Sequence, residues 1–153
     1  MANLDVINDI LEKAKAAKKT IVLPESHDDR VLKAAEKLNN EGIAKVITLV
    51  NENKIRERAN ELEIDLKGVR IIDPERSDML SDFSNILFNL RKHKGLTIVA
   101  ARETMKKDLF FGAMMVKESM ADGFVAGSTA STGDVLKAAL QCVGMPEGIS
   151  IVS

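Results

Sequence analysis

Apolar residues in the first half of the chain alternate between helical spacing and short continuous runs. Helical spacing appears at positions 4–14 and again over 28–40 and 51–62. Between these stretches lie three runs typical of buried strands, namely TIVLPE (20–25), AKVITLV (44–50) and VRIID (69–73). Strands that alternate with helices through short turns predict a parallel sheet covered by helices on both faces. We therefore predict an α/β fold with three layers, α/β/α, and a mostly parallel sheet.

The second half of the chain is mainly helical in pattern. Apolar positions share one face over 78–90, and two shorter helices are expected in IVAARETMK and LFFGAMMVKESM. We expect a strand at 123–127, a helix at 132–143 and a last strand in the final ISIVS. Parallel strands need covering helices, so a strand with nothing after it is unusual. We take residues 1–153 as one α/β domain and expect its architecture to be incomplete.

Composition and charge exclude several classes of function. The 153 residues are 45% hydrophobic and 29% charged, which is typical of a globular domain with one core. The 22 Lys and Arg residues balance 23 Asp and Glu residues, so no basic surface is expected to attract nucleic acid or an anionic membrane. The chain has neither Trp nor Tyr for stacking on bases. We expect no nucleic-acid partner.

The single cysteine and the N-terminal segment indicate the compartment. Cys142 has no second cysteine to pair with, which fits a reducing environment, and its apolar neighbours favour a buried, inert thiol over a nucleophile. Acidic residues interrupt the apolar pattern of positions 1–19, unlike a signal peptide. No apolar run approaches the roughly 20 residues that span a bilayer. We expect a soluble, cytoplasmic protein with no membrane partner.

The first candidate site lies in GFVAGSTASTGDVLKAALQ, residues 123–141. A short apolar run gives way to small and hydroxylated residues before a helical pattern resumes. Loops beyond the carboxyl ends of strands present backbone N–H groups and a helix N-terminus, which suit a phosphate. The residues in this position are Gly127, Ser128, Thr129, Ser131, Thr132 and Gly133, with Lys137 inside the following helix. The spacing matches no phosphate-loop or dinucleotide motif, so composition alone favours Ser131 or Thr132 as a plain helix N-cap.

Two further stretches carry charged residues. In LRKHKG (90–95), basic residues complement the C-terminus of a helix, and Gly95 suits the residue that follows it. The guanidinium of Arg91 would also suit a phosphate if it faced a cleft, although spacing alone favours the helix-end interpretation. In LPESHDDR (23–30), acidic residues and His27 superficially resemble a metal site. Helix capping by Asp28 or Asp29 is the better interpretation, so we predict no metal site.

Six blocks of the sequence resemble the phosphate acetyltransferase (phosphotransacetylase) family in the same order and register. They are TIVLPESHDDR, GIAKVITLVNE, IIDPE, LRKHKGLT, DLFFGAMMVKESMADGFVAGSTASTGDVLKAALQ and GISIVS. The resemblance runs from the first helix to Ser153. Because family members are considerably longer, we expect this chain to be the N-terminal portion of such an enzyme, which explains the last strand.

The resemblance implies an acetyl transfer between coenzyme A and inorganic phosphate: acetyl-CoA and phosphate give acetyl phosphate and CoA. CoA is then a substrate, and no cofactor is implied. Family members fold as two α/β domains with the active site in the cleft between them, and they commonly form dimers, so we expect a homo-oligomer. An aspartate base assists the CoA thiol, and it lies in the part of the family fold that this chain lacks. The chain alone is therefore expected to be inactive.

The resemblance also assigns candidate roles to individual residues. Arg91 stands where the family has an active-site arginine, and segment 127–137 matches the loop that lines the cleft. Arg91 and Lys137 are thus candidate catalytic residues. The candidate phosphate-binding residues are Ser128, Thr129, Ser131 and Thr132. The family usually has Arg-Pro where this chain has Lys137 and Ala138, a His in place of Ala130, and a Pro in place of Leu109. Lysine keeps the charge but loses the bidentate fork of arginine.

Other functions stay open at this point. One is the same chemistry on a longer acyl group such as butyryl. Another is a module that binds an anion or a partner subunit without catalysis, which the departures at Lys137, Ala138 and Ala130 favour. A nicotinamide-dependent dehydrogenase is a poor alternative, because no dinucleotide glycine pattern follows an early strand.

Overall fold

The computed structural model of the chain describes residues 2–145, with side chains from Asp5 onward. Its sheet has four strands in the order β3-β2-β1-β4, and every neighbouring pair is parallel. The strands are β1 (Thr20–Leu23), β2 (Lys45–Leu49), β3 (Arg70–Ile72) and β4 (Gly123–Phe124). This confirms the predicted α/β class and the parallel sheet. The expected last strand, ISIVS, lies outside the described residues.

The described part of the chain has seven α-helices, which agree with the predicted helical segments to within a few residues. They are α1 (Ala2–Ala17), α2 (Asp29–Asn40), α3 (Glu52–Glu61), α4 (Met79–Arg91), α5 (Ile98–Met105), α6 (Asp108–Lys117) and α7 (Thr132–Cys142). A short 3-10 turn, η1 (Lys92–Lys94), follows α4 and ends at Gly95, whose φ of 85° is left-handed. Glycine adopts this conformation without steric cost, as the sequence predicted for that position.

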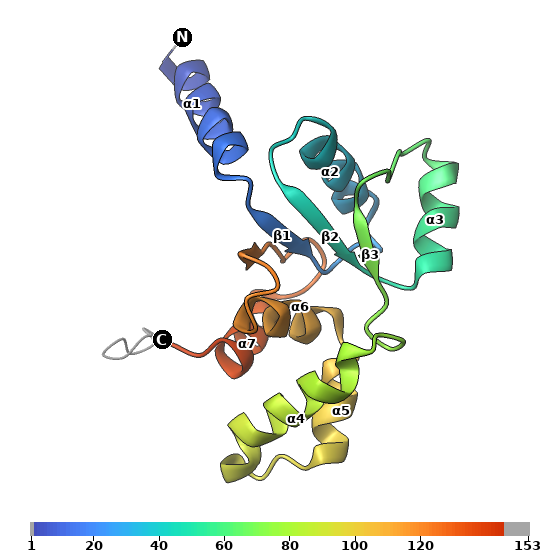
Figure 1. Cartoon of the computed structure of the whole chain (residues 1–153), viewed down its shortest axis with the longest axis vertical. Helices are drawn as coiled ribbons and strands as arrows, with labels where there is room; N and C mark the ends of the chain where they lie inside the picture. Colours follow the sequence, from blue (N-terminus) through green and yellow to red (C-terminus); the bar gives the residue numbers. More distant parts are fainter. Residues whose placement is uncertain (1, 146–153) are drawn as a thin grey trace.

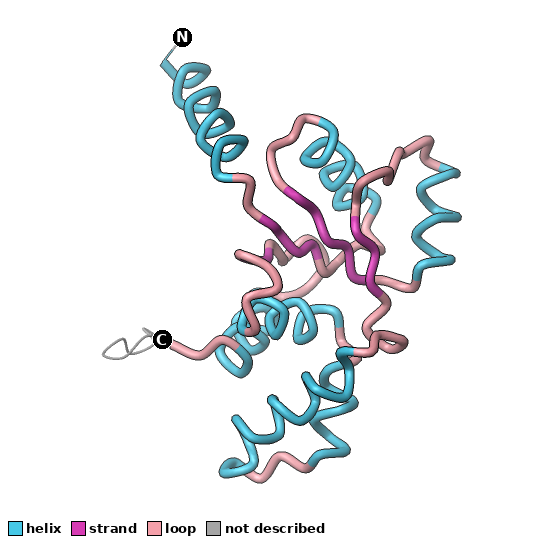
Figure 2. Tube along the Cα trace, viewed as in Figure 1, coloured by secondary structure: helices cyan, strands magenta, loops and turns pink. Residues whose placement is uncertain are grey.

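Helices cover both faces of the sheet, which makes three layers (Figures 1 and 2). Successive residues of a strand point to opposite faces. In β1, Val22 joins the main core with residues of α4, α5, α6 and α7, whereas Leu23 packs with residues of α2 on the other face. Both side chains are buried, at 0% and 6% exposure. The predicted α/β/α layering is therefore confirmed.

Helix α1 stands apart from the rest of the described structure (Figure 1). Its pattern correctly predicts a helix, but the side chains of Val6, Ile7 and Ile10 are each more than half exposed. The apolar face of α1 is therefore largely open to solvent in the described structure.

Two properties of the described residues bear on earlier expectations. None of the helices within residues 2–145 combines the length and apolar character needed to cross a membrane. Cys142 is buried at 2% exposure. Burial raises the pKa of its thiol to about 12, with a smaller opposing effect from the charge of Arg91, so the thiol stays protonated at neutral pH. This confirms the prediction of a buried, inert cysteine.

Candidate functional site

The segments that follow β1 and β4 run side by side at the carboxyl end of the sheet. The two strands pair in parallel, with Ile21 opposite Gly123 and Val22 opposite Phe124. The backbone N–H of Val125 then donates to the carbonyl of Val22 at 3.0 Å. Strand β4 ends at Phe124, three residues before the left-handed Gly127, so the predicted strand 123–127 is too long. Open α/β sheets bind ligands at this edge.

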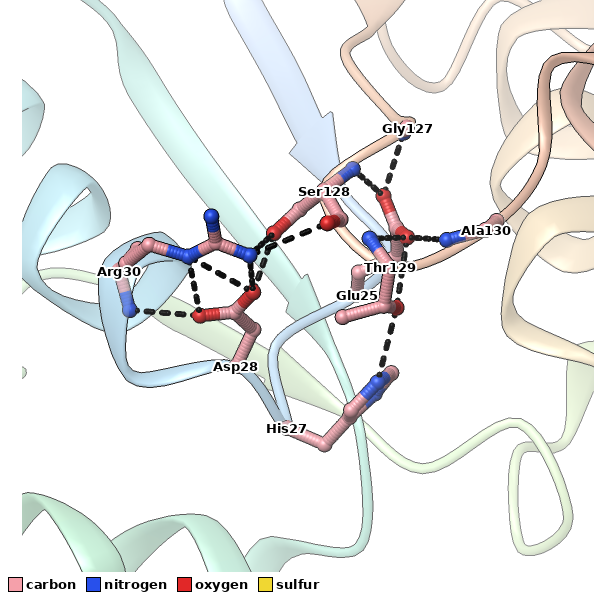
Figure 3. A network of polar contacts seen from close by, with 8 residues as sticks. All are labelled: Glu25, His27, Asp28, Arg30, Gly127, Ser128, Thr129 and Ala130. Atoms are coloured by element: carbon pink, nitrogen blue, oxygen red, sulfur yellow. Dashed lines mark hydrogen bonds and ion pairs between the residues drawn. The ribbon is translucent and has the colours of Figure 1, made fainter.

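The carboxylate of Glu25, just after β1, lies inside the loop of residues 127–130 (Figure 3). Its Oε2 accepts from the backbone N–H groups of Gly127 and Ser128, at 2.5 and 2.8 Å. Its Oε1 accepts from the N–H groups of Thr129 and Ala130, at 2.7 and 2.6 Å, and from the Thr129 hydroxyl at 2.8 Å. Five donors thus surround a carboxylate whose residue is 3% exposed.

The protonation of Glu25 follows from this environment. Burial by itself raises the pKa of the carboxyl, but the hydrogen bonds from Ala130, Thr129 and Ser128 oppose it and lower the pKa to about 2. Hydrogen bonds to a carboxylate favour its charged form, so Glu25 is an anion at neutral pH. The backbone amides of residues 127–130, three of which belong to the predicted phosphate-binding stretch, are therefore already occupied by a carboxylate of the same chain.

A second attachment of the same loop involves the N-terminus of α2. Asp28 caps the helix by accepting from the backbone N–H of Arg30 at 2.9 Å, which confirms the capping interpretation of LPESHDDR. The Arg30 guanidinium pairs with Asp28 at 2.6 Å and donates to the Ser128 carbonyl at 3.1 Å. The Ser128 hydroxyl also donates to Asp28. Hydrogen bonds from Arg30 and Ser128 hold the pKa of Asp28 well below its usual range.

His27 contacts the loop at Thr129. Its Nε2 lies 3.2 Å from the Thr129 hydroxyl oxygen. The hydroxyl has one proton, which it donates to Glu25, so Nε2 of His27 must carry a proton and donate it. Among the described residues, no group of three or more His, Cys, Asp or Glu side chains is placed to hold a metal ion.

Helix α7 begins directly after the loop. Ser131 is its N-cap: the hydroxyl accepts from the N–H of Asp134 at 3.1 Å and donates to the Asp134 carboxylate at 2.7 Å. This confirms the capping interpretation of Ser131. Thr132 is the first residue of α7 and is exposed. Asp134 already places a negative charge at this helix N-terminus, which complements the helix dipole and weakens its attraction for another anion.

A cleft between the end of α4 and the outer face of α7 brings together the two predicted cations, Arg91 and Lys137. It has a volume of about 500 Å³. Its lining residues are Arg91, Lys94, Gly133, Leu136, Lys137, Leu140, Gln141 and Met145. Of these described lining residues, three are cationic and none is acidic. Clustered cations without a carboxylate create a positive potential that favours a small anion.

The structure thus places four of the six predicted site residues in two groups, while Ser131 and Thr132 lie at the N-terminus of α7. Arg91 and Lys137 share the cationic cleft, which they line with Lys94, a residue that sequence reasoning assigned only to the helix end. Ser128 and Thr129 instead hold the loop to Asp28 and Glu25. Neighbouring strands β1 and β4 create this second cluster, and their adjacency was not visible in the sequence.

The fold and the cleft define a parallel α/β protein with a cationic site between the end of α4 and α7. A family model described as phosphate acetyl/butaryl transferase matches residues 5–153, so the chain belongs to that family. The phosphate acetyltransferase of Acetivibrio thermocellus is 49% identical over 150 residues, which are 98% of this chain and 45% of that protein. The phosphate acetyltransferase of Thermoanaerobacterium thermosaccharolyticum is 44% identical with the same coverage.

The chain is also similar in structure to solved phosphotransacetylases. A phosphotransacetylase from Streptococcus pyogenes superposes with a TM-score of 0.92 at 30% identity, over 99% of this chain and 46% of that one. The EutD phosphotransacetylase from Staphylococcus aureus gives a TM-score of 0.87 at 33% identity, over 97% and 44% of the two chains. The chain therefore spans slightly less than half the length of these relatives.

Proposed function

We propose that the chain supplies the phosphate-binding side of an active site that transfers an acetyl group between coenzyme A and inorganic phosphate. The observation that carries this proposal is the cleft of about 500 Å³ in which Arg91, Lys94 and Lys137 come together. Membership of the phosphate acetyl/butaryl transferase family supports the same chemistry. The relatives named above are phosphate acetyltransferases, which favours acetyl over butyryl as the acyl group.

In the proposed reaction, the cationic groups of the cleft bind and orient the phosphate. A phosphate oxygen attacks the thioester carbonyl of acetyl-CoA, the C–O bond forms, the C–S bond breaks, and the CoA sulfur leaves and takes up a proton. Arg91, Lys94 and Lys137 hold the phosphate by charge and keep its oxygen oriented toward the carbonyl. Holding the two reactants in the correct orientation removes a large part of the activation free energy of such a transfer. CoA acts as a substrate, and we propose no further cofactor.

We propose that the base and the oxyanion donors come from outside these 153 residues, as the family resemblance implies. The described lining of the cleft includes Gln141 besides cations and apolar residues, and it has no His, Asp or Glu, the side chains that most often take a proton in catalysis. The chain alone is then expected to bind phosphate and to turn over little or no acetyl phosphate.

We further propose a cytoplasmic homo-oligomer. The single, buried Cys142 supports the cytoplasmic compartment, and the exposed apolar face of α1 supports association between copies of the chain.

A chimeric enzyme tests this proposal. The 153 residues would replace the aligned 150 residues of the Acetivibrio thermocellus phosphate acetyltransferase, and thioester formation from CoA and acetyl phosphate would be followed by absorbance. We expect turnover by the chimera and none by the chain alone. Arg91→Ala should lower kcat/KM by roughly 10- to 100-fold, the loss of one charge-assisted hydrogen bond. Lys54→Ala, at an exposed position of α3, is the matched control and should leave the rate unchanged.

Two outcomes would overturn the proposal. A folded chimera without turnover, combined with phosphate binding by the chain, would favour the alternative of a non-catalytic anion-binding module. Robust turnover by the chain alone would place the base within the 153 residues.

A further inference from the structure

Glu25 occupies a site that has the form of an anion receptor. Four consecutive backbone N–H groups, those of residues 127–130, point at its two oxygens, and the Thr129 hydroxyl adds a fifth donor (Figure 3). Successive backbone amides arranged in this way form a concave nest that binds anions. A buried carboxylate with all its acceptor positions taken is a rigid attachment between the end of β1 and this loop.

The loop leads without interruption into the cationic cleft. Residue 130 precedes Ser131, the N-cap of α7, and Gly133 and Lys137 of that helix line the cleft with Arg91. Arg91 comes from α4, a different element. The distance between the two cations therefore depends on how α7 is placed relative to α4, and the loop fixes the start of α7.

We propose that Glu25 is a positioning residue for phosphate binding: it acts as a built-in anion that fixes the 127–130 loop, and through it the start of α7 and Lys137. This inference rests on the proposed function of the cleft. A phosphate does not use the loop amides, because binding there would require Glu25 to leave. The phosphate instead binds at Arg91, Lys94 and Lys137, in the cleft along the outer face of α7.

The attachment through Asp28 and Arg30 does not replace Glu25. The Arg30 side chain is 74% exposed, and exposed ion pairs are screened by water and salt. It also reaches the loop only at Ser128, whereas Glu25 holds every residue from Gly127 to Ala130. Loss of Glu25 should therefore free the loop at its α7 end.

The test uses Glu25→Gln and, as a matched control, Glu57→Gln, which removes the same charge from an exposed position of α3. Glutamine keeps the size of the side chain, but its NH₂ group faces N–H donors and accepts from none of them. Inorganic phosphate would be titrated into each protein by calorimetry, and the backbone amides of residues 127–130 would be followed by ¹H–¹⁵N NMR.

The sign of the affinity change separates positioning from simple electrostatics. Removing a negative charge by itself strengthens the binding of an anion. The positioning role instead predicts that Glu25→Gln weakens phosphate binding by about tenfold, the loss of roughly one charge-assisted hydrogen bond from a misplaced Lys137. Glu57→Gln should bind phosphate as the wild type does. The four amide resonances of the loop should shift upfield and exchange faster with solvent in Glu25→Gln only.

Glu25→Asp keeps the experiment decisive if the glutamine variant does not fold. Aspartate retains the charge but is one methylene shorter, so it reaches fewer of the five donors, and an intermediate loss of affinity is expected. Unchanged or tighter phosphate binding in a folded variant with shifted loop amides would overturn the inference. Absence of phosphate binding by the wild type would instead refute the proposed function, while the amide shifts would still report whether Glu25 holds the loop.

Discussion

Arg91 and Lys137 come from different helices, α4 and α7, and line the same cleft. Cys142 of α7 packs in the core close enough to Arg91 for the charge to affect its pKa. Helices α4 and α7 thus share one buried interface, and the two cations lie at its edge. Their convergence depends on the core and is independent of any local motif.

The lysine at position 137 gives the first prediction. Its ammonium is a point charge, whereas a guanidinium binds two phosphate oxygens through a planar fork. Lys137→Arg should therefore tighten the binding of inorganic phosphate by about tenfold, the value of one added charge-assisted hydrogen bond. Calorimetric titration measures this directly. Weaker binding by Lys137→Arg would mean that the cleft is too narrow for the longer side chain.

Acid stability depends on Glu25. Its pKa falls from 4.5 in the unfolded chain to about 2 in the folded protein. A depressed carboxyl pKa contributes stability above pH 4.5, and this contribution is lost as the pH falls toward 2. Allowing for solvent screening, we expect Glu25 to contribute about 2 kcal/mol at neutral pH. Urea denaturation of wild type and Glu25→Gln should show a gap in unfolding free energy that narrows from pH 5 to pH 2; a constant gap would contradict this.

Asp108 at the start of α6 has the opposite pH dependence. Burial raises its pKa from 3.8 to about 6, with further contributions from Asp73 and Glu75 and an opposing one from His27. The folded protein then holds the proton more tightly than the unfolded chain, so stability falls as the pH rises from about 4 to 6. Asp108→Asn should be more stable than the wild type at pH 7, by about 1 kcal/mol. The two proteins should unfold alike at pH 3.5, as measured by thermal denaturation.

Gly112 of α6 lies close against the side chains of two strands. A Cβ atom at this position would lie 3.3 Å from side-chain carbons of both Leu49 and Val22. Gly112→Val should therefore overpack the core and lower the unfolding free energy by about 2 kcal/mol. Gly133 in α7 is the control, because its nearest neighbour would be 3.8 Å from the added Cβ. Gly133→Ala should gain up to about 1 kcal/mol from helix propensity. Equal effects at both positions would contradict this packing.

Much of the fold follows from local patterns in the sequence. Continuous β-branched runs predicted β1, β2 and β3, and helical spacing predicted the helices between them. The strand predicted at 123–127 is longer than the observed strand β4. Its apolar residues continue to Ala126, whereas the pairing with β1 stops at Phe124. The exposed apolar face of α1 shows a second limit: periodicity identifies an amphipathic helix, but it does not identify the element that covers it.

The candidate site was predictable only in part. Charge and family resemblance pointed to Arg91 and Lys137, and the structure places both on one cleft. Sequence reasoning gave Glu25 no role of its own within LPESHDDR. The reason is that its five hydrogen-bond donors lie about 100 residues further along the chain. Such a contact depends on the β1–β4 pairing, which no local pattern reveals. The same pairing explains why the amides of residues 127–130 face a carboxylate of the chain itself.

The central claim is that the cleft between α4 and α7 binds phosphate. The most direct test is calorimetric titration of inorganic phosphate into the wild-type chain, Arg91→Ala and the control Lys54→Ala at low ionic strength. We predict one site in the wild type and in Lys54→Ala, with affinity reduced roughly 10- to 100-fold in Arg91→Ala. Equal phosphate affinity in all three proteins, or no binding by the folded wild type, would contradict the claim.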